Sequence, residues 1–244
     1  MTSQTLPLID IEKVCYTPAG TPVLRDVSLR SDASRIGIVG RNGSGKTSFA
    51  RVLSGLVAAD GGQVRIGGID VARDRRRAVG AVGILFQNPD HQIIFPTVEE
   101  EIAFGLLQMG QSKAEAARGV AAILGQFDKR HWAQASIHQL SQGQRQLVCL
   151  MAVLAMQPRV LVLDEPFAGL DIPTRLHLER VLAGLDLTLV HITHDPAAVA
   201  GYDHILWLER GEVAQQGSAR PVLRAFETRM KELGASDDLS DLAG

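Results

Sequence analysis

The spacing of apolar residues predicts strands in the first third of the chain. Apolar and polar residues alternate over 9–14 and again over 23–29, after the turn T-P-A-G-T-P, which is typical of half-buried strands. Short apolar runs rich in branched residues predict further strands at 36–39, 63–66 and 81–86. Helical spacing over 46–57 lies between the third and fourth of these strands and stops at A-A-D-G-G.

Helical spacing dominates the middle of the chain. Thr97 is predicted to be the N-cap of a helix, because acidic residues follow it in the first turn. Two more helices are predicted at 112–124 and 142–156. Strands and helices then alternate again. The remaining predictions are strands at 160–163 and 187–192, a helix at 174–185 between them, a hairpin within 205–213 and a last helix at 219–233.

This order of elements predicts an α/β fold. We expect a parallel core, an antiparallel β part near the N-terminus and an α-helical subdomain inserted between two core strands. The core comprises 8–87 and 158–217, the helical subdomain about 88–157, and a C-terminal helix with a frayed tail 218–244. Because no repeat or low-complexity linker divides the chain, we expect a single domain over 1–244.

Composition and charge narrow the class of protein. The 244 residues are 45% hydrophobic and 21% charged, with a net charge of −2, so nucleic acid is not an expected partner. The basic run 73–77 is interpreted as a solvated face beside a strand. Cys15 and Cys149 lack metal-site spacing, which fits a reducing cytosol. The N-terminus lacks a secretion signal, and the longest apolar run, 147–156, is about half a membrane span, so membrane work would need partners.

The segment G-R-N-G-S-G-K-T at 40–47 matches G-x-x-x-x-G-K-[ST] between a predicted strand and a predicted helix. Its glycines let the backbone wrap a triphosphate with the N–H groups pointing inward, while Lys46 adds a positive charge and the Thr47 hydroxyl can bind Mg²⁺. The residues expected around the nucleotide here are Gly40, Asn42, Gly43, Ser44, Gly45, Lys46, Thr47 and Ser48.

The segment V-L-V-L-D-E at 160–165 is an apolar strand that ends in two carboxylates. Adjacent side chains leave a strand tip in different directions, so one can support Mg²⁺ while the other faces a water at the γ-phosphate. We assign Asp164 to the metal and Glu165 to the general base, or to positioning of that water.

Other polar residues follow predicted strands and are weaker candidates. Gln87 is placed to reach Mg²⁺ or the attacking water, although alone it would be interpreted as a solvated Gln. His194 is a candidate for contact with the γ-phosphate, and His191 is interpreted as a bystander. The Tyr16 ring would stack on a base, with a partly buried core tyrosine as the alternative.

The segment Q-L-S-Q-G-Q-R-Q-L at 139–147 places Ser and Gly at the start of a predicted helix. Alone, Ser141 would be an ordinary N-cap. The hydroxyl, the free backbone N–H groups and the positive end of the helix dipole also make an anion site.

Taken in order, the phosphate loop, Gln87, L-S-Q-G-Q, V-L-V-L-D-E, A-G-L-D and T-H-D resemble the nucleotide-binding domain of ABC transporters, a P-loop NTPase. The resemblance covers roughly 8–217 and implies ATP as the nucleotide and a head-to-tail dimer. It implies that Ser141, Gly143 and Gln144 serve ATP held by the partner subunit, that Asp171 lies at the dimer interface and that Tyr16 stacks on adenine. Gln142 departs from the commoner Gly of L-S-G-G-Q.

A second resemblance involves Q-N-P-D-H-Q-I at 87–93 and F-P-T-V-E-E-E-I-A-F-G after it, which look like ATPases of energy-coupling-factor (ECF) importers. It implies a transmembrane coupling protein and a small membrane-embedded substrate-binding subunit, at the cytoplasmic face of the inner membrane. Asp90, Gln92 and Glu101 are candidates for transmitting closure, or alternatively solvated residues. The chain looks most like ATPases of biotin importers, with cobalt or nickel importers as an alternative.

Two other functions remain alternatives at this stage. The chain would energise an ordinary importer that uses a periplasmic binding protein, or it would be a soluble ATPase of the same family acting on nucleic acid or ribosomes. The acidic net charge speaks against the second alternative. The sequence leaves open whether both ATPase positions hold the same chain.

Overall fold

The computed structural model describes residues 7–235, which form two β-sheets and their covering helices. The smaller sheet is antiparallel and has the strand order β2-β1-β4-β5. Its strands are β1 (Ile9–Tyr16), β2 (Leu24–Ser31), β4 (Gly61–Ile66) and β5 (Ile69–Asp70). This sheet is the antiparallel β part that the sequence predicts.

The larger sheet has the order β10-β9-β3-β8-β7-β6 and is parallel except at β10, which closes a hairpin with β9. Its strands are β3 (Arg35–Val39), β6 (Val82–Leu85), β7 (Val160–Asp164), β8 (Thr188–Thr193), β9 (His204–Glu209) and β10 (Glu212–Gly217). Because five neighbouring strands run the same way, the residues that follow them meet at one edge of the sheet.

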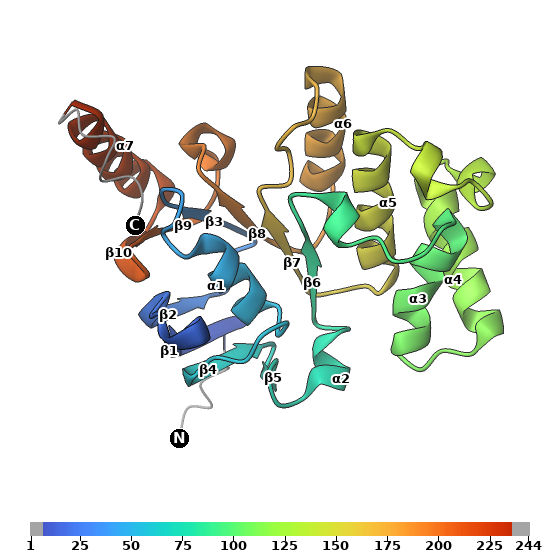
Figure 1. Ribbon diagram of the computed structural model, residues 1–244, viewed down its shortest axis with the longest axis horizontal. Coiled ribbons are helices and arrows are strands. Elements are labelled where there is room, and N and C mark those ends of the chain that lie inside the picture. Colours follow the sequence, from blue (N-terminus) through green and yellow to red (C-terminus); the bar gives the residue numbers. More distant parts are fainter. Residues whose placement is uncertain (1–6, 236–244) are drawn as a thin grey trace.

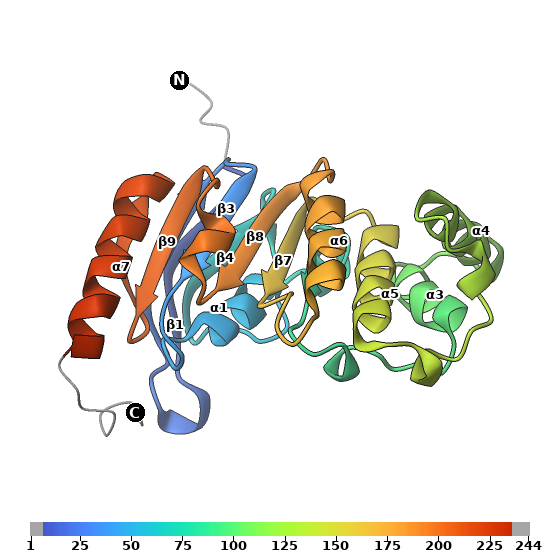
Figure 2. The same ribbon diagram turned by 90° about the horizontal axis from the view of Figure 1, so that it is seen from above.

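The helices divide into those that flank the sheets and a group set apart from them (Figures 1 and 2). They are α1 (Lys46–Leu53), α2 (Arg75–Ala78), α3 (Val98–Gln108), α4 (Lys113–Gln126), α5 (Gln142–Ala155), α6 (Ile172–Ala183) and α7 (Ala219–Ala235). Short 3₁₀ turns lie at Pro18–Gly20, Pro89–His91, Arg130–Trp132, Ile137–Gln139 and Pro196–Val199. Helices α3, α4 and α5 stand at one end of the molecule and α7 at the other (Figure 2).

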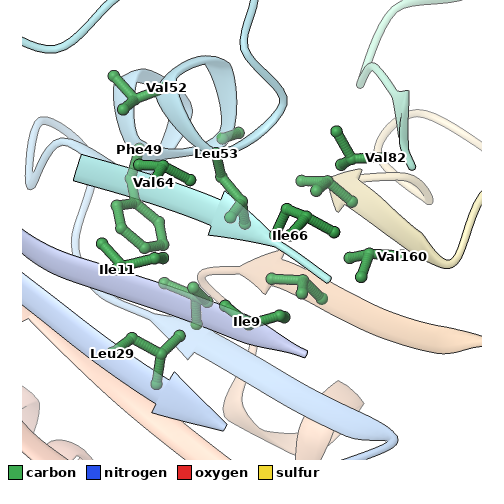
Figure 3. Packing of buried hydrophobic residues seen from close by; sticks show 14 of the residues in the cluster. Ile9, Ile11, Leu29, Phe49, Val52, Leu53, Val64, Ile66, Val82 and Val160 are labelled. Atoms are coloured by element: carbon green, nitrogen blue, oxygen red, sulfur yellow. The ribbon is translucent and has the colours of Figure 1, made fainter. Parts of the chain in front are cut away.

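Alternate residues of β7 pack into two different hydrophobic clusters, one on each face of the strand. Val160 and Val162 belong to the cluster around α1 and the antiparallel sheet, whereas Leu161 and Leu163 belong to the cluster around the inserted helices. In the first cluster, Phe49 and the core-facing apolar side chains of β1 and β4, such as Ile9 and Ile66, are almost fully buried (Figure 3). Burial of each such large apolar side chain stabilises the fold by about 1.5–3 kcal/mol. A strand buried on both faces must be apolar throughout, as V-L-V-L is.

The last helix packs on the edge of the parallel sheet through a smaller cluster. Trp207 of β9 and Phe226 of α7 meet edge to face, with ring centroids 5.6 Å apart. Val222 and Leu223 of the same helix are also buried. The helix is thereby held beside β9, close to the edge of the sheet where the phosphate loop lies.

One sequence prediction about local structure is wrong. The first helix ends at Leu53 rather than at residue 57, because Gly55 turns the chain with φ of +72° and a Cβ there would lie 2.6 Å from the Val71 carbonyl oxygen. The basic run is a solvated face, as predicted, because its four arginines are exposed; it enters α2, which is capped by the Asp74 side chain and lies beside β5. The strand β5 was not predicted, since it contains only two residues.

Two expectations from the sequence concern residues at the chain ends that the structure does not describe. The predicted frayed tail includes 236–244, and the signal-free N-terminus includes 1–6, which both lie beyond the described residues. Within 7–235, none of the helices combines the length and the apolar character that a membrane crossing requires.

The burial of His191 predicts how the stability of the fold depends on pH. Its ring is 2% exposed, contacts Phe167 edge to face and lies 3.3 Å from the Tyr202 hydroxyl through Nδ1. Burial, with a smaller contribution from Arg175, lowers the pKa of His191 from its usual 6.5 to about 4. The unfolded chain therefore binds more protons than the folded chain between these values, and stability is lost as the pH falls from about 6.5 to 4.

We expect the free energy of unfolding to fall by about 3 kcal/mol more in the native protein than in His191→Gln over that interval. Urea denaturation at a series of pH values measures the difference. Parallel pH profiles for the two proteins would contradict the assignment of this loss to His191.

Candidate active site

The phosphate loop connects β3 to α1 and depends on glycine at defined positions. Gly43 and Gly45 have φ of +79° and +99°, in the left-handed region that other residues rarely adopt. A Cβ on Gly40 would lie 2.3 Å from the carbonyl oxygen of Leu208. The loop is fastened to the hairpin of β9 and β10, because the Gly211 N–H donates to the Ser44 carbonyl at 3.0 Å. The loop is therefore a fixed cradle.

Lys46 turns back into this loop. Its ammonium donates to the carbonyl oxygens of Gly40 at 2.8 Å and Arg41 at 2.9 Å, and the residue is 7% exposed. Burial lowers the pKa of Lys46, and the charges of Glu165 and Asp164 oppose that shift. A buried cation that faces carboxylates but forms no direct ion pair with them within 7–235 is suited to binding an anion.

Ser44 gives a second observation that fits a phosphate group. Its hydroxyl oxygen is buried and has no hydrogen-bond partner among the described residues. Buried hydroxyls are nearly always paired, because an unmet hydrogen bond costs about 1–3 kcal/mol. Phosphate oxygens in the loop would supply acceptors for this hydroxyl.

The carboxylate of Asp164 lies beside Thr47. The Thr47 hydroxyl donates to Asp164 Oδ1 at 3.4 Å, and Asp164 is 4% exposed. Burial is the main reason that the pKa of Asp164 is raised, and the neighbouring Glu165 adds to the shift while the Thr47 hydrogen bond opposes it. A bound cation would stabilise this buried charge, and the hydroxyl and carboxylate oxygens are the ligand type that Mg²⁺ prefers.

Glu165 is held at the tip of β7 in an unusual backbone conformation. Its φ is +50°, and its N–H donates to the Ile192 carbonyl of β8 at 3.0 Å. Glu165 Oε1 lies 2.8 Å from His194 Nδ1, and Oε2 accepts from the Thr193 hydroxyl at 3.3 Å. Glu165 and His194 are thus brought together as a pair, with the imidazole 64% exposed at the mouth of the site.

The L-S-Q-G-Q segment at 140–144, here called the signature turn, forms a double hydrogen-bonded cap at the start of α5. Gln144 N–H donates to the Ser141 hydroxyl at 3.3 Å, and Gln144 Oε1 accepts from the Ser141 N–H at 2.8 Å. Gly143 is required because a Cβ there would lie 2.1 Å from Cγ2 of Thr174 in α6. The Gln142 side chain donates to the Ala168 carbonyl at 3.5 Å. The start of α5 is therefore packed against the A-G-L-D segment and the start of α6.

The signature turn lies toward the β6 edge of the parallel sheet, away from the phosphate loop of the same chain. The loop follows β3, whereas α5 packs against β6, with β8 and β7 between these two strands. Figure 2 shows α5 on the side of α6 away from α1. The phosphate loop and the start of α5 of one chain are therefore separated by two strands of the sheet.

The segment after Gln87 is organised by buried polar side chains. Glu101 is 6% exposed and its Oε2 accepts from the N–H groups of Ile94 and Phe95, both at 2.9 Å. The alternative of a solvated Glu101 is therefore wrong. Gln92 Oε1 accepts from the Phe86 N–H at 3.2 Å, whereas Gln87 is exposed.

Asp90 and Tyr16 are two further candidate residues from the sequence. Asp90 is exposed and its Oδ1 lies 3.0 Å from Nε of Arg145, just after the signature turn. Tyr16 ends β1 and is partly buried against the first core cluster. Its proposed stacking on adenine stays a prediction.

Gln146 is a site residue that the sequence analysis missed. It is 1% exposed, and its Nε2 donates to the carbonyl oxygens of Phe86 at 2.9 Å and Pro166 at 3.4 Å. These carbonyls directly precede Gln87 and follow Glu165, so one side chain joins both loops to the signature helix. A Gln inside the otherwise apolar run of α5 was the available signal.

A glycine-rich anion loop, a carboxylate pair two strands away and a separate Ser-Gly cap on an inserted helix define an ATP-binding cassette domain. The family model "ABC transporter" matches residues 24–168. The chain belongs to the ABC transporter family, as an ATP-binding subunit, and it is an ATPase coupled to transport. The fold class and the resemblance inferred from the sequence are thereby confirmed.

The relatives narrow the type of transporter. Biotin transport ATP-binding protein BioM of Rhodobacter capsulatus is 49% identical over 92% of this chain and 96% of its own. Energy-coupling factor transporter ATP-binding protein EcfA1 of Latilactobacillus sakei is 35% identical over 90% of this chain and 80% of its own. The chain is therefore an ATPase of the ECF type.

A solved structure has the same fold. The cbiO1 protein of Clostridium perfringens, described as part of the ABC transporter complex cbiONQ, superimposes with a TM-score of 0.76. It is 27% identical, and the match covers 92% of this chain and 94% of that one.

Gln146 is expected to be required for both stability and turnover. In Gln146→Ala the Phe86 and Pro166 carbonyls lose a buried donor, so the free energy of unfolding should fall by about 1–3 kcal/mol. Turnover should fall with it, because Gln87 and Glu165 adjoin these carbonyls. Urea denaturation and phosphate release measure the two effects. Gln108→Ala, at an exposed helix end, is the control, and equal behaviour of the two variants would refute the role.

Proposed function

We propose that this chain dimerises head to tail around two Mg-ATP molecules and drives an ECF-type biotin importer. The observation that carries the proposal is the separation of a phosphate loop from a signature turn on one rigid chain. Because neither half encloses a triphosphate alone, the arrangement favours a second copy that supplies the missing half. ATP would then bridge the subunits, and loss of its γ-phosphate would let them separate.

Each side chain has a distinct task in this proposal. Lys46, Ser44 and the loop N–H groups bind the phosphates, and Ser141 and Gly143 contact the γ-phosphate from the other subunit. Glu165 takes a proton from the attacking water, and His194 orients the Glu165 carboxylate through the 2.8 Å contact. Gln144 keeps the Ser141 hydroxyl in place.

Thr47, Asp164 and Gln87 would hold Mg²⁺. When bound, the ion neutralises charge that develops on the phosphate oxygens. The buried Asp164 carboxylate beside the Thr47 hydroxyl supports this assignment, and the exposed Gln87 completes the set from the neighbouring strand end.

The surface after Gln87 fits a membrane partner. A groove of about 430 Å³ lies between the core and the inserted helices. Its lining includes Leu56, Phe86, Gln92, Ile94 and Phe104. Ile94 is 68% exposed, and Leu56 is 49% exposed. An apolar groove of this kind suits a helix of a transmembrane coupling protein. Gln92 connects the groove to Phe86, which precedes Gln87, and Glu101 holds the backbone of Ile94 and Phe95.

The cargo is proposed from the relatives, since an ATPase subunit does not itself contact it. BioM proteins of Rhodobacter capsulatus and Rhizobium etli, 49% and 40% identical, carry names of biotin transport. We place the chain at the cytoplasmic face of the inner membrane, with a coupling protein and a small substrate-binding subunit. Cobalt or nickel uptake is the alternative.

Glu165→Gln tests the catalytic assignment. The variant should bind ATP as the native protein does, because the carboxylate is not part of the phosphate loop. Its turnover should fall by at least a hundredfold, since the amide cannot accept the proton, and the ATP-bound dimer should persist. Phosphate release with membrane partners and gel filtration with ATP are the measurements. Near-native turnover would rule out Glu165 as the base.

A pull-down in mild detergent from native membranes tests the transporter. Co-purification of a coupling protein and a small membrane subunit that retains biotin is the expected result. Retained cobalt or nickel would overturn the biotin assignment alone. Recovery of ribosomes or nucleic acid without a membrane protein would overturn the transport proposal.

A further inference from the structure

A cluster of exposed arginines lies on and just before the short helix α2. Its members are Arg73, Arg75, Arg76 and Arg77, and all four are exposed. Val71 and Ala78, which are 1% and 4% exposed, anchor the same segment in the first core cluster. The segment is thus fixed to the core by its apolar residues, while its charges remain in solvent.

Two acids neutralise only part of this cluster. Asp70 lies 3.7 Å from the guanidinium of Arg73, and Asp74, the cap of α2, lies 3.4 Å from that of Arg77. The other two arginines of the segment take part in no ion pair within 7–235. The cluster therefore presents an excess of positive charge.

The two unpaired arginines lie at the edge of the groove that we propose for a transmembrane coupling protein. Arg75 is part of the groove lining, and Phe104 of α3 belongs to the same lining. Arg76 lies close to the turn after α3, since a Cβ on Gly110 would be 3.3 Å from its Nη2 atom. Figure 1 shows α2 at the lower edge of the molecule, well separated from α7. Helix α2 therefore forms one rim of the groove.

This position decides what the arginines would face in an importer. A coupling helix reaches the groove from the membrane, so the rim formed by α2 would be turned toward the phospholipid headgroups. Guanidinium groups stay charged and bind phosphate oxygens through several N–H donors. The chain as a whole has a net charge of −2, so attraction to an anionic surface requires a local basic cluster of this kind.

An acidic segment of the coupling protein fits the cluster less well. Only Arg75 belongs to the lining of the groove, and the other three arginines lie outside it. A protein segment held in the groove would leave those three without a partner, whereas an extended anionic surface can attract all of them.

We propose that the arginines of α2 bind the anionic phospholipid surface of the membrane and hold the subunit with its groove toward the coupling protein. The inference rests on the importer proposed above, since only a membrane transporter gives the groove a membrane-facing side. A two-fold axis along the membrane normal would place the clusters of both subunits at the same surface. The contact would not depend on ATP.

Vesicle sedimentation tests the lipid contact with the full chain alone. The chain should sediment with vesicles that contain phosphatidylglycerol and not with vesicles of phosphatidylcholine, and salt should release it. Arg75→Gln combined with Arg76→Gln should lower the partition coefficient about tenfold or more. Arg220→Gln combined with Arg224→Gln is the matched control, because these arginines of α7 are also exposed and form no ion pair within 7–235. Equal losses in the two double variants, or native binding that ignores phosphatidylglycerol, would overturn the proposal.

Lysine substitution distinguishes a lipid surface from an acidic protein segment. Arg75→Lys combined with Arg76→Lys keeps the charge but removes the paired N–H groups with which arginine binds a carboxylate. On a lipid surface, this variant should bind vesicles nearly as tightly as the native chain. The glutamine variant should still co-purify with the coupling protein in lipid-free detergent, and loss of that protein would assign the arginines to a protein contact and overturn the proposal. Because the vesicle experiment contains neither ATP nor a partner, its failure would leave the importer standing, whereas the pull-down from native membranes tests the importer.

Discussion

Burial of the Lys46 ammonium is the constraint on which the site depends. The cation is almost removed from water, its donors are directed at two carbonyl groups of its own loop, and the carboxylates of Asp164 and Glu165 supply the nearby negative charge. Such a group is stable only where backbone dipoles and charges are fixed around it. The parallel sheet provides this, because the ends of β3, β7 and β8 meet at one edge and hold loop, carboxylates and His194 in register.

Two buried polar side chains of the inserted helices form hydrogen bonds with the loops that follow the strands of the parallel sheet. Glu101 of α3 fixes the N–H groups of Ile94 and Phe95, and Gln146 of α5 bonds the carbonyls of Phe86 and Pro166. Both rigidify loops that apolar packing alone would leave free. The Oε1 atom of Gln146 is buried without a partner among 7–235, so this side chain joins the two loops through Nε2 alone.

The sequence predicts the parts of this molecule that depend on local chemistry. Short continuous segments of sequence determine the phosphate loop, the apolar strand before Asp164 and the cap at Ser141. The strands and the helix that contain them begin and end within a few residues of the predicted bounds. Contacts between segments that are distant in the sequence could not be predicted from the sequence. Gln146 meets carbonyls 60 and 20 residues away, and Gly143 is needed because of Thr174 on another helix. The length of α1 was overestimated because Gly55 meets Val71, which lies in the turn after β5.

In the proposed dimer, each chain supplies one half of every phosphate site. The signature cap has an oriented hydroxyl and free N–H groups but no lysine, while the loop has a buried lysine but no cover. A triphosphate that satisfies both halves binds the closed pair better than the separated chains, and only that difference in affinity can move the equilibrium. Removing the γ-phosphate removes the group that both halves would share. In the proposed dimer, the coupling of hydrolysis to movement therefore follows from splitting one anion site between two rigid surfaces of each chain.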